Sequence, residues 1–205
     1  MTLRTLLSLS LVLGCGLVAG VFFAFSSFVM PALARLPAPA GIAAMQAINV
    51  AAVTRVFMVA LFGTAAGCVL LVVLSLAALD EPGARLRIGG AALYVIGAIV
   101  VTAVVNVPRN DALAVLQPDL AESAVVWSRY VAEWTAWNHV RGACSLAAAA
   151  LLLLSGGSLL PRRSLSLPLD AARSPLPAST PSPAASTTSS GSTARSAVLG
   201  AAAVR

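Results

Sequence analysis

His139 is the only histidine in the chain, and it is the side chain best suited to exchange a proton near neutral pH. Its neighbours Asn138 and Arg141 carry N–H groups that can stabilise a negative charge developing on a substrate oxygen. This short segment predicts a catalytic group made of a general base, His139, and two hydrogen-bond donors. The alternative interpretation is a histidine that only makes a hydrogen bond at the start of a helix.

A single histidine limits the cofactors that the chain can hold. It cannot supply both axial ligands of a bis-histidine haem, and a zinc site needs three or four ligands. The sequence contains no glycine-rich phosphate loop or nucleotide fingerprint. Cys15, Cys68 and Cys144 each lie inside an apolar run, where a cysteine behaves as a small apolar residue. We expect no metal site and no cofactor.

Aromatic residues precede His139 at helical spacing. Trp127, Tyr130, Trp134 and Trp137, together with Arg141, recur at intervals of three and four, which places them on one helical face. Such an aromatic stripe either lines a pocket for a planar ligand or lies at the membrane interface, where tryptophan and tyrosine are favoured. Because a charge near hydrocarbon needs partners, we expect Arg141, and the stripe with it, to face inward.

Three asparagines accompany the stripe as substrate-binding candidates: Asn49, Asn106 and Asn110. Asn106 and Asn110 flank Pro108, which lacks an amide hydrogen, so a helix is expected to end at Val107. The two amides then either cap the freed carbonyls or contribute to a site, and they are the expected partners of Arg141, with Asp111 as the alternative. Asn49 is interpreted as a cap, an interhelical hydrogen bond or a third site amide.

The elements that must position these residues are apolar helices. Hydrophobic residues make up 59% of the chain and charged residues 10%. Four apolar runs are long enough to cross a bilayer: residues 6–29, 56–79, 88–107 and 140–160. The sequence predicts an all-α, four-transmembrane-helix bundle over residues 1–160, with the first run closed by Pro31. A cleaved signal peptide is the alternative for that run, although no polar mature start follows it.

Two further segments flank the fourth run. Asp119, with Glu122 three residues later, resembles a helix start, so an amphipathic aromatic helix is expected before the fourth span. Residues 161–205 are dense in proline, serine and alanine and are expected to form a disordered tail.

The charge pattern fits a membrane as the partner. Every basic residue is arginine, and these arginines stand singly beside apolar runs, which excludes a nucleic-acid-binding surface. A small arginine excess on the side of the termini predicts a multi-pass protein of the cell membrane with cytoplasmic termini. The sequence does not indicate an oligomeric state. The expected partners are the lipid bilayer and a lipophilic aromatic small molecule.

Four motifs taken together resemble one family, the anthrone oxygenase-like small four-helix membrane proteins. The resemblance covers about Leu6 to Leu154, and its motifs are Gly16–Ser26, Met45–Asn49, Asn106–Asn110 and Trp134–Arg141. It implies cofactor-free oxidation of an anthrone-like polycycle by O2. His139 would then be the base, Asn106, Asn110, Asn138 and Arg141 would donate to an enolate oxygen, and Trp127, Trp134 and Trp137 would stack on the substrate. A non-catalytic protein that binds a lipophilic ligand or a partner helix is the alternative.

Overall fold

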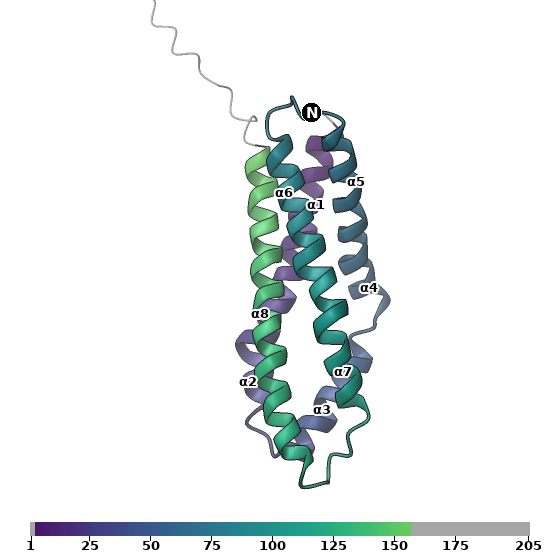
Figure 1. Ribbon diagram of the computed structural model, residues 1–205, viewed down its shortest axis with the longest axis vertical. Coiled ribbons are helices and arrows are strands. Elements are labelled where there is room, and N and C mark those ends of the chain that lie inside the picture. The colour runs from purple at the N-terminus through teal and green to yellow at the C-terminus, as the bar shows by residue number, and fades with distance from the viewer. Residues whose placement is uncertain (1–2, 157–205) are drawn as a thin grey trace, which may run out of the picture. The chain divides into compact units, whose positions relative to one another are not determined.

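The computed structural model describes residues 3–156, which form five continuous helices and no strand (Figure 1). Residues 1–2 and 157–205, including the predicted tail, lie outside the described part of the chain. The elements, with η for π-helical turns, are α1 (Leu3–Ala24), η1 (Phe25–Val29), α2 (Met30–Leu33), α3 (Ala38–Ala51), α4 (Arg55–Met58), η2 (Val59–Gly63), α5 (Thr64–Leu76), α6 (Ala84–Tyr94), η3 (Val95–Val100), η4 (Thr102–Asn106), α7 (Val107–Ala114) and α8 (Ser123–Ser155).

Four long helices pack side by side in a bundle. The helix that contains α1 contacts α5 and α8, and α6 contacts the same two helices from the other side, while α3 closes the end where α7 and the start of α8 lie (Figure 1). One apolar core, around Val18, Leu71, Tyr94 and Leu152, fills the bundle. A second core, around Met45, joins α3 to α2 and to the aromatic residues of α8.

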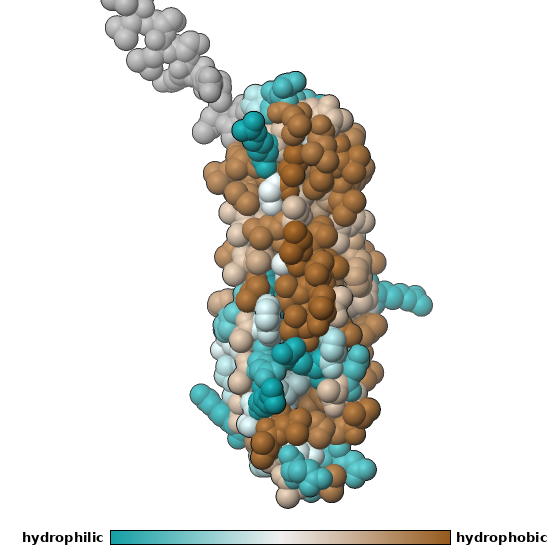
Figure 2. Space-filling model, in the orientation of Figure 1, coloured by the Kyte–Doolittle hydropathy of each residue, from teal (hydrophilic) through white to brown (hydrophobic). Residues whose placement is uncertain are grey.

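Three helices are long and apolar enough to cross a membrane: Leu3–Leu33, Arg55–Leu76 and Ala84–Ala114. Large apolar side chains such as Leu13, Phe23 and Val104 point outward, and Figure 2 shows apolar residues over most of the visible face of the bundle. These features indicate a membrane protein. The fourth predicted span, residues 140–160, extends past the last described residue and stays a prediction.

Two prolines do not end helices, contrary to the sequence prediction. The first helix continues through Pro31 to Leu33, and the third continues through Pro108 to Ala114. In each case a π-helical turn, Phe25–Val29 or Thr102–Asn106, directly precedes the α-helical segment that holds the proline. A proline in a regular helix lacks an amide hydrogen and clashes with the carbonyl four residues earlier. The wider π turn changes that register, so the helix accommodates the ring.

The last helix is a single element. α8 has 33 residues and begins at Ser123, not at Asp119 as expected, because residues 117–122 form turns in which the Ser123 hydroxyl donates to the Gln117 carbonyl at 2.7 Å. At 1.5 Å per residue α8 is about 50 Å long, longer than the hydrocarbon core. The aromatic residues and the start of the fourth predicted span therefore share one continuous helix. Nothing in the sequence indicated α3 as a separate helix.

Candidate functional site

Arg141 lies inside the bundle, with 5% of its surface exposed. Its Nη1 donates to the Thr102 hydroxyl at 3.1 Å and its Nη2 to the Asn138 carbonyl oxygen at 2.6 Å. The guanidinium carbon lies 4.4 Å from the Phe22 ring centre and 5.0 Å from that of Trp134. Among the described residues Arg141 has no ion pair, and its Nε has no hydrogen-bond partner. Neutral dipoles and ring faces, and not a carboxylate, hold this cation.

The expected contact between Arg141 and the end of the third predicted span is confirmed: the oxygen of Asn106, one of the two expected partners, accepts from Arg141 Nη2 at 3.3 Å. Thr102, which the sequence analysis did not single out, is a further hydrogen-bond partner there. Asp111, the expected alternative, is exposed and makes no ion pair within the described chain. Thr102 lies one helical turn before Asn106, and this spacing in the sequence could have identified Thr102 as a second polar residue on the same helix face.

Asn138 joins α8 to the first helix. Its side chain is fully buried, and its Nδ2 donates to the Phe22 carbonyl and to the Ser26 hydroxyl, both at 2.6 Å. The Phe22 carbonyl lies just before η1, where the α-helical pairing of carbonyls and amides changes register. Such a turn re-aims backbone groups and is frequent at functional sites. Because Arg141 donates to its oxygen, all polar atoms of the Asn138 amide are engaged.

Asn106 and Asn110 turn toward α8 and do not cap a helix. The Asn106 amide is best oriented with its oxygen toward donors, where it accepts from Arg141 Nη2 and Trp134 Nε1, each at 3.3 Å. The oxygen of Asn110 accepts from the Tyr130 hydroxyl and from Trp134 Nε1, both at 2.9 Å. The two asparagines therefore fix Trp134, which in turn covers one face of the Arg141 guanidinium.

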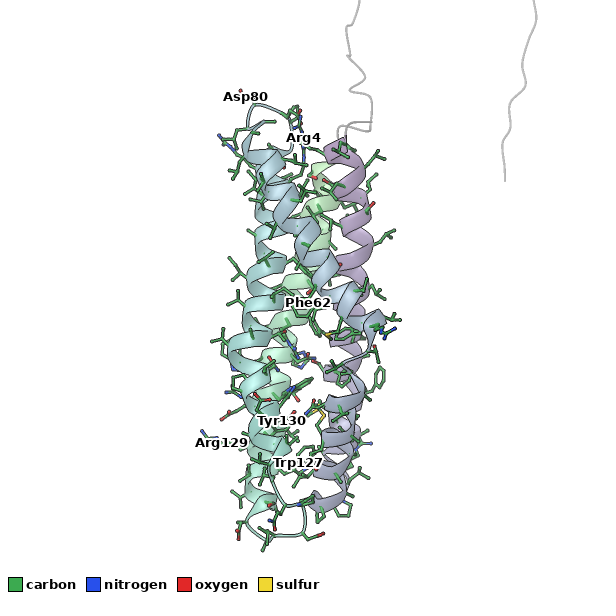
Figure 3. The ribbon with its side chains drawn as sticks, turned by 90° about the vertical axis from the view of Figure 1, so that its right-hand side faces the viewer. Arg4, Phe62, Asp80, Trp127, Arg129 and Tyr130 are labelled. Carbon is green, nitrogen blue, oxygen red and sulfur yellow. The ribbon has the colours of Figure 1, made fainter. Side chains whose placement is uncertain are left out.

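Three of the four aromatic residues of the stripe face inward. Trp127, Tyr130 and Trp134 are buried, with ring centres 5.7 Å and 6.5 Å apart in succession, and Figure 3 shows the first two on the inner side of α8. Burial raises the pKa of the Tyr130 phenol, which therefore stays neutral. Trp137 is 40% exposed, so its expected inward position is wrong: Asn138 occupies that place on the helix.

His139 lies on the outside of α8, at the junction of two apolar grooves. The first, which we call the lower groove, has a volume of about 350 Å³ and runs between Met30 and Thr135. The second, the upper groove, has a volume of about 410 Å³ and runs between the first helix and α8. Its polar side chains are Ser26, Asn138 and His139. The structure thus brings His139 and Asn138 together on one groove wall, with Arg141 behind Asn138.

A family model described as anthrone oxygenase matches residues 57–151. Over these residues the chain is similar to that family, which supports an anthrone oxygenase-like assignment. The match runs from α4 through most of α8, so it includes the segment from Asn106 to Asn110 and the one from Trp134 to Arg141. No curated protein and no solved structure matched the chain.

Residues outside the matched range complete the site. Ser26 and Phe22, on the first helix, receive the Asn138 amide. Asn49, on α3, lies beside the Tyr130 phenol, and its Nδ2 is buried without a partner in the described chain. Gln46 donates to the carbonyls of Leu113 and Leu116, at 2.9 and 3.0 Å, and so caps the end of α7. α3 therefore stabilises the aromatic end of the bundle. The sequence analysis did not predict this role.

Proposed function

We propose that this chain is a multi-pass protein of the cell membrane, with four spans and cytoplasmic termini, that oxidises a lipophilic, anthrone-like polycycle with O2 and without a cofactor. The observation that carries the proposal is the pairing of His139 and Asn138 on the wall of an apolar groove, with the buried cation of Arg141 directly behind the amide. The groove opens on the outer surface of the bundle, so a lipophilic substrate would reach it from the bilayer.

The reaction balances without any external reductant. An anthrone methylene loses a proton to His139 and becomes an electron-rich enolate, which passes one electron to O2. The resulting superoxide and carbon radical combine, and protonation gives a hydroperoxide. Loss of the second methylene proton with cleavage of the O–O bond gives the anthraquinone carbonyl and water. One O2 is consumed, one oxygen atom enters the product and the other leaves as water.

Arg141 supports this chemistry as a positioning residue. It does not line the groove, but its Nη2 donates to the Asn138 oxygen, and this polarises the amide, whose Nδ2 donates to the Ser26 hydroxyl on the groove wall. A cation without a counter-ion in an apolar bundle is costly, and an enolate formed beside Asn138 would compensate it. Electrostatic groups fixed before the reaction stabilise a developing charge without reorganisation.

The tryptophans have a different role from the one expected. Trp127 and Trp134 stack within the bundle and line neither groove, and Trp137 points outward. In this proposal Trp134, with Asn106 and Asn110, holds Arg141 in place. Direct stacking on the substrate falls instead to Phe23, which is exposed and lines the upper groove.

A second function, binding of a lipophilic ligand without chemistry, is favoured by one observation. His139 makes no hydrogen bond with any other residue in the range 3–156 that the structure describes. A general base usually has a second group that fixes its ring and tautomer. If the bound ligand does not supply that group, the grooves bind and do not catalyse.

Oxygen uptake by the purified protein in detergent, with an anthrone and a metal chelator, tests the proposal. The wild type should exceed buffer autoxidation, and His139→Ala should lower the rate by about 10²- to 10⁴-fold, as loss of a general base does. Ser128→Ala, at an exposed residue of the same helix that lines neither groove, should keep the wild-type rate. A wild-type rate equal to buffer refutes the oxygenase proposal, and ligand binding without turnover would then support the second function. Full activity of His139→Ala would show that the base lies elsewhere.

A further inference from the structure

The upper groove continues well beyond the catalytic pair. Its lower end is formed by Ser26, Asn138 and His139, and its far end by Gly16 and Leu146. At 1.5 Å per residue, Leu146 lies about 10 Å beyond His139 along α8. All the polar side chains of the groove are at the lower end, so the far end is an apolar trough about 10 Å long.

The direction of the trough follows from the membrane position. The span-capable helix Arg55–Leu76 has 22 residues and a length of about 33 Å, which matches a hydrocarbon core of about 30 Å. α8 ends at Ser155, beside the turn at Gly83 on one side of this layer. His139 lies about 24 Å below that end and Leu146 about 14 Å below it, at the 1.5 Å rise of a helix. The trough therefore runs from near one membrane boundary to the midplane.

Two glycines leave the trough open. A Cβ at Gly16 or Gly20 would meet no atom within 4 Å, whereas one at Gly67 would collide with Leu11 at 2.7 Å. The close approach of α1 and α5 explains why residue 67 is a glycine, but it does not explain the glycines at positions 16 and 20. Glycine weakens a helix, so two unneeded glycines in α1 require another reason. The space that their missing side chains leave is part of the groove.

We infer that the substrate of this site carries an aliphatic chain as well as an oxidisable aromatic ring. The ring lies at His139, where both grooves meet, and the chain lies in the trough, pointing to the membrane midplane. This is the orientation that an amphipathic molecule adopts in a bilayer, with its polar part near the boundary. The inference rests on the proposed function and adds the class of substrate: an anthrone or hydroquinone with an alkyl or isoprenoid tail.

The test compares two substrates and two matched variants in the oxygen-uptake assay. The substrates share one anthrone ring, and only one bears an octyl chain; both are supplied at equal mole fraction in detergent. Gly16→Leu fills the trough away from His139. Gly89→Leu is the matched control, because a Cβ at Gly89 also meets no atom within 4 Å and Gly89, on α6, lines neither groove.

In the wild type and in Gly89→Leu the octyl substrate should show an apparent KM about fivefold lower than that of the bare ring. The gain is modest because the chain leaves one apolar phase for another. Gly16→Leu should remove that difference by raising the apparent KM of the octyl substrate to that of the bare ring, because the added side chain fills the trough.

Three results would overturn the inference. Equal KM values for both substrates in the wild type would show that the trough binds no chain. The proposed function would be unaffected, because the ring would still be oxidised. A chain effect that persists in Gly16→Leu would place the chain elsewhere on the protein. Oxidation of neither substrate would remove the proposed function, and with it this inference.

Discussion

Replacing Asn138 by leucine should loosen the contact between the first helix and α8. The side chain is fully buried and makes three hydrogen bonds of 2.6 Å, to the Phe22 carbonyl, the Ser26 hydroxyl and the guanidinium of Arg141. Leucine has a similar size but can make none of them. The Ser26 hydroxyl can rotate toward another partner, and Arg141 Nη2 keeps its weaker bond to the Asn106 oxygen, whereas the Phe22 carbonyl cannot move without its helix.

The size of the effect can be worked out bond by bond. Interhelical hydrogen bonds in membranes contribute about 0.6 kcal/mol on average and at most about 1.7, and Asn138 makes two of them to the first helix. A lost hydrogen bond to a charged group adds about 1.5–3 kcal/mol, because Arg141 then has fewer partners inside the bundle. Together these terms predict a loss of about 3–6 kcal/mol in the free energy of unfolding.

Unfolding by a denaturing detergent in mixed micelles, followed by tryptophan fluorescence, would measure this loss. Thr135→Val is the control on the same helix: the Thr135 hydroxyl is buried with no partner in the described chain, so the isosteric valine should be neutral or slightly stabilising. In Asn138→Leu combined with Arg141→Met, the two losses should be less than additive, because both changes remove one shared bond. Asn138→Leu within about 0.5 kcal/mol of the wild type would refute the reasoning, since that is the effect of an ordinary surface change.

Three further predictions use other parts of the bundle. Arg141→Met keeps the apolar contacts with Phe22 and Trp134 but removes the charge. The kcat for anthrone oxidation should therefore fall by about 10²- to 10³-fold, with a smaller change in KM. A rate within threefold of the wild type would exclude the positioning role of Arg141. At the other end of the bundle, hydrogen bonds from Arg4 and then from Arg87 hold the pKa of Glu81 below its usual 4.5. The charged Glu81 therefore stabilises the fold fully above pH 4.5, and this stabilisation is lost as the pH falls through the lowered pKa. The gap in thermal midpoint between wild type and Glu81→Gln should therefore close as pH falls from neutral through the lowered pKa, and a gap that widened would show the opposite linkage. For topology, a periplasmic reporter fused at Asp119 should be active and one at Glu81 inactive, and the reverse pattern would place the termini outside.

The sequence determined the elements that carry the site. Apolar runs of about 20 residues can only be satisfied in a membrane as helices, because every backbone polar group must pair within its own segment. The same reasoning predicted that Arg141 must face inward, since a charge close to hydrocarbon needs dipoles around it. The inward positions of Trp127 and Trp134 followed from their spacing to Arg141.

Tertiary structure decided which neighbour of those residues completes the inner face. Trp137 and Asn138 lie four and three residues before Arg141, and both spacings fit one helical face, so periodicity alone could not choose between them. The structure chooses Asn138, because the first helix presents the Phe22 carbonyl and Ser26 opposite it. That rotation turns His139 outward, to the grooves, and away from Arg141.

The continuity of the helices through their prolines could likewise not be predicted from local sequence rules. Pro31 and Pro108 are breakers in an isolated helix, yet both helices continue, because π-helical turns before each proline change the hydrogen-bond register. Beside the first of these turns, a side chain of another helix bonds a backbone group: Asn138 donates to the Phe22 carbonyl. The sequence thus determined which long apolar segments become helices, whereas α3 and the way the helices bend depended on contacts between segments far apart in the chain.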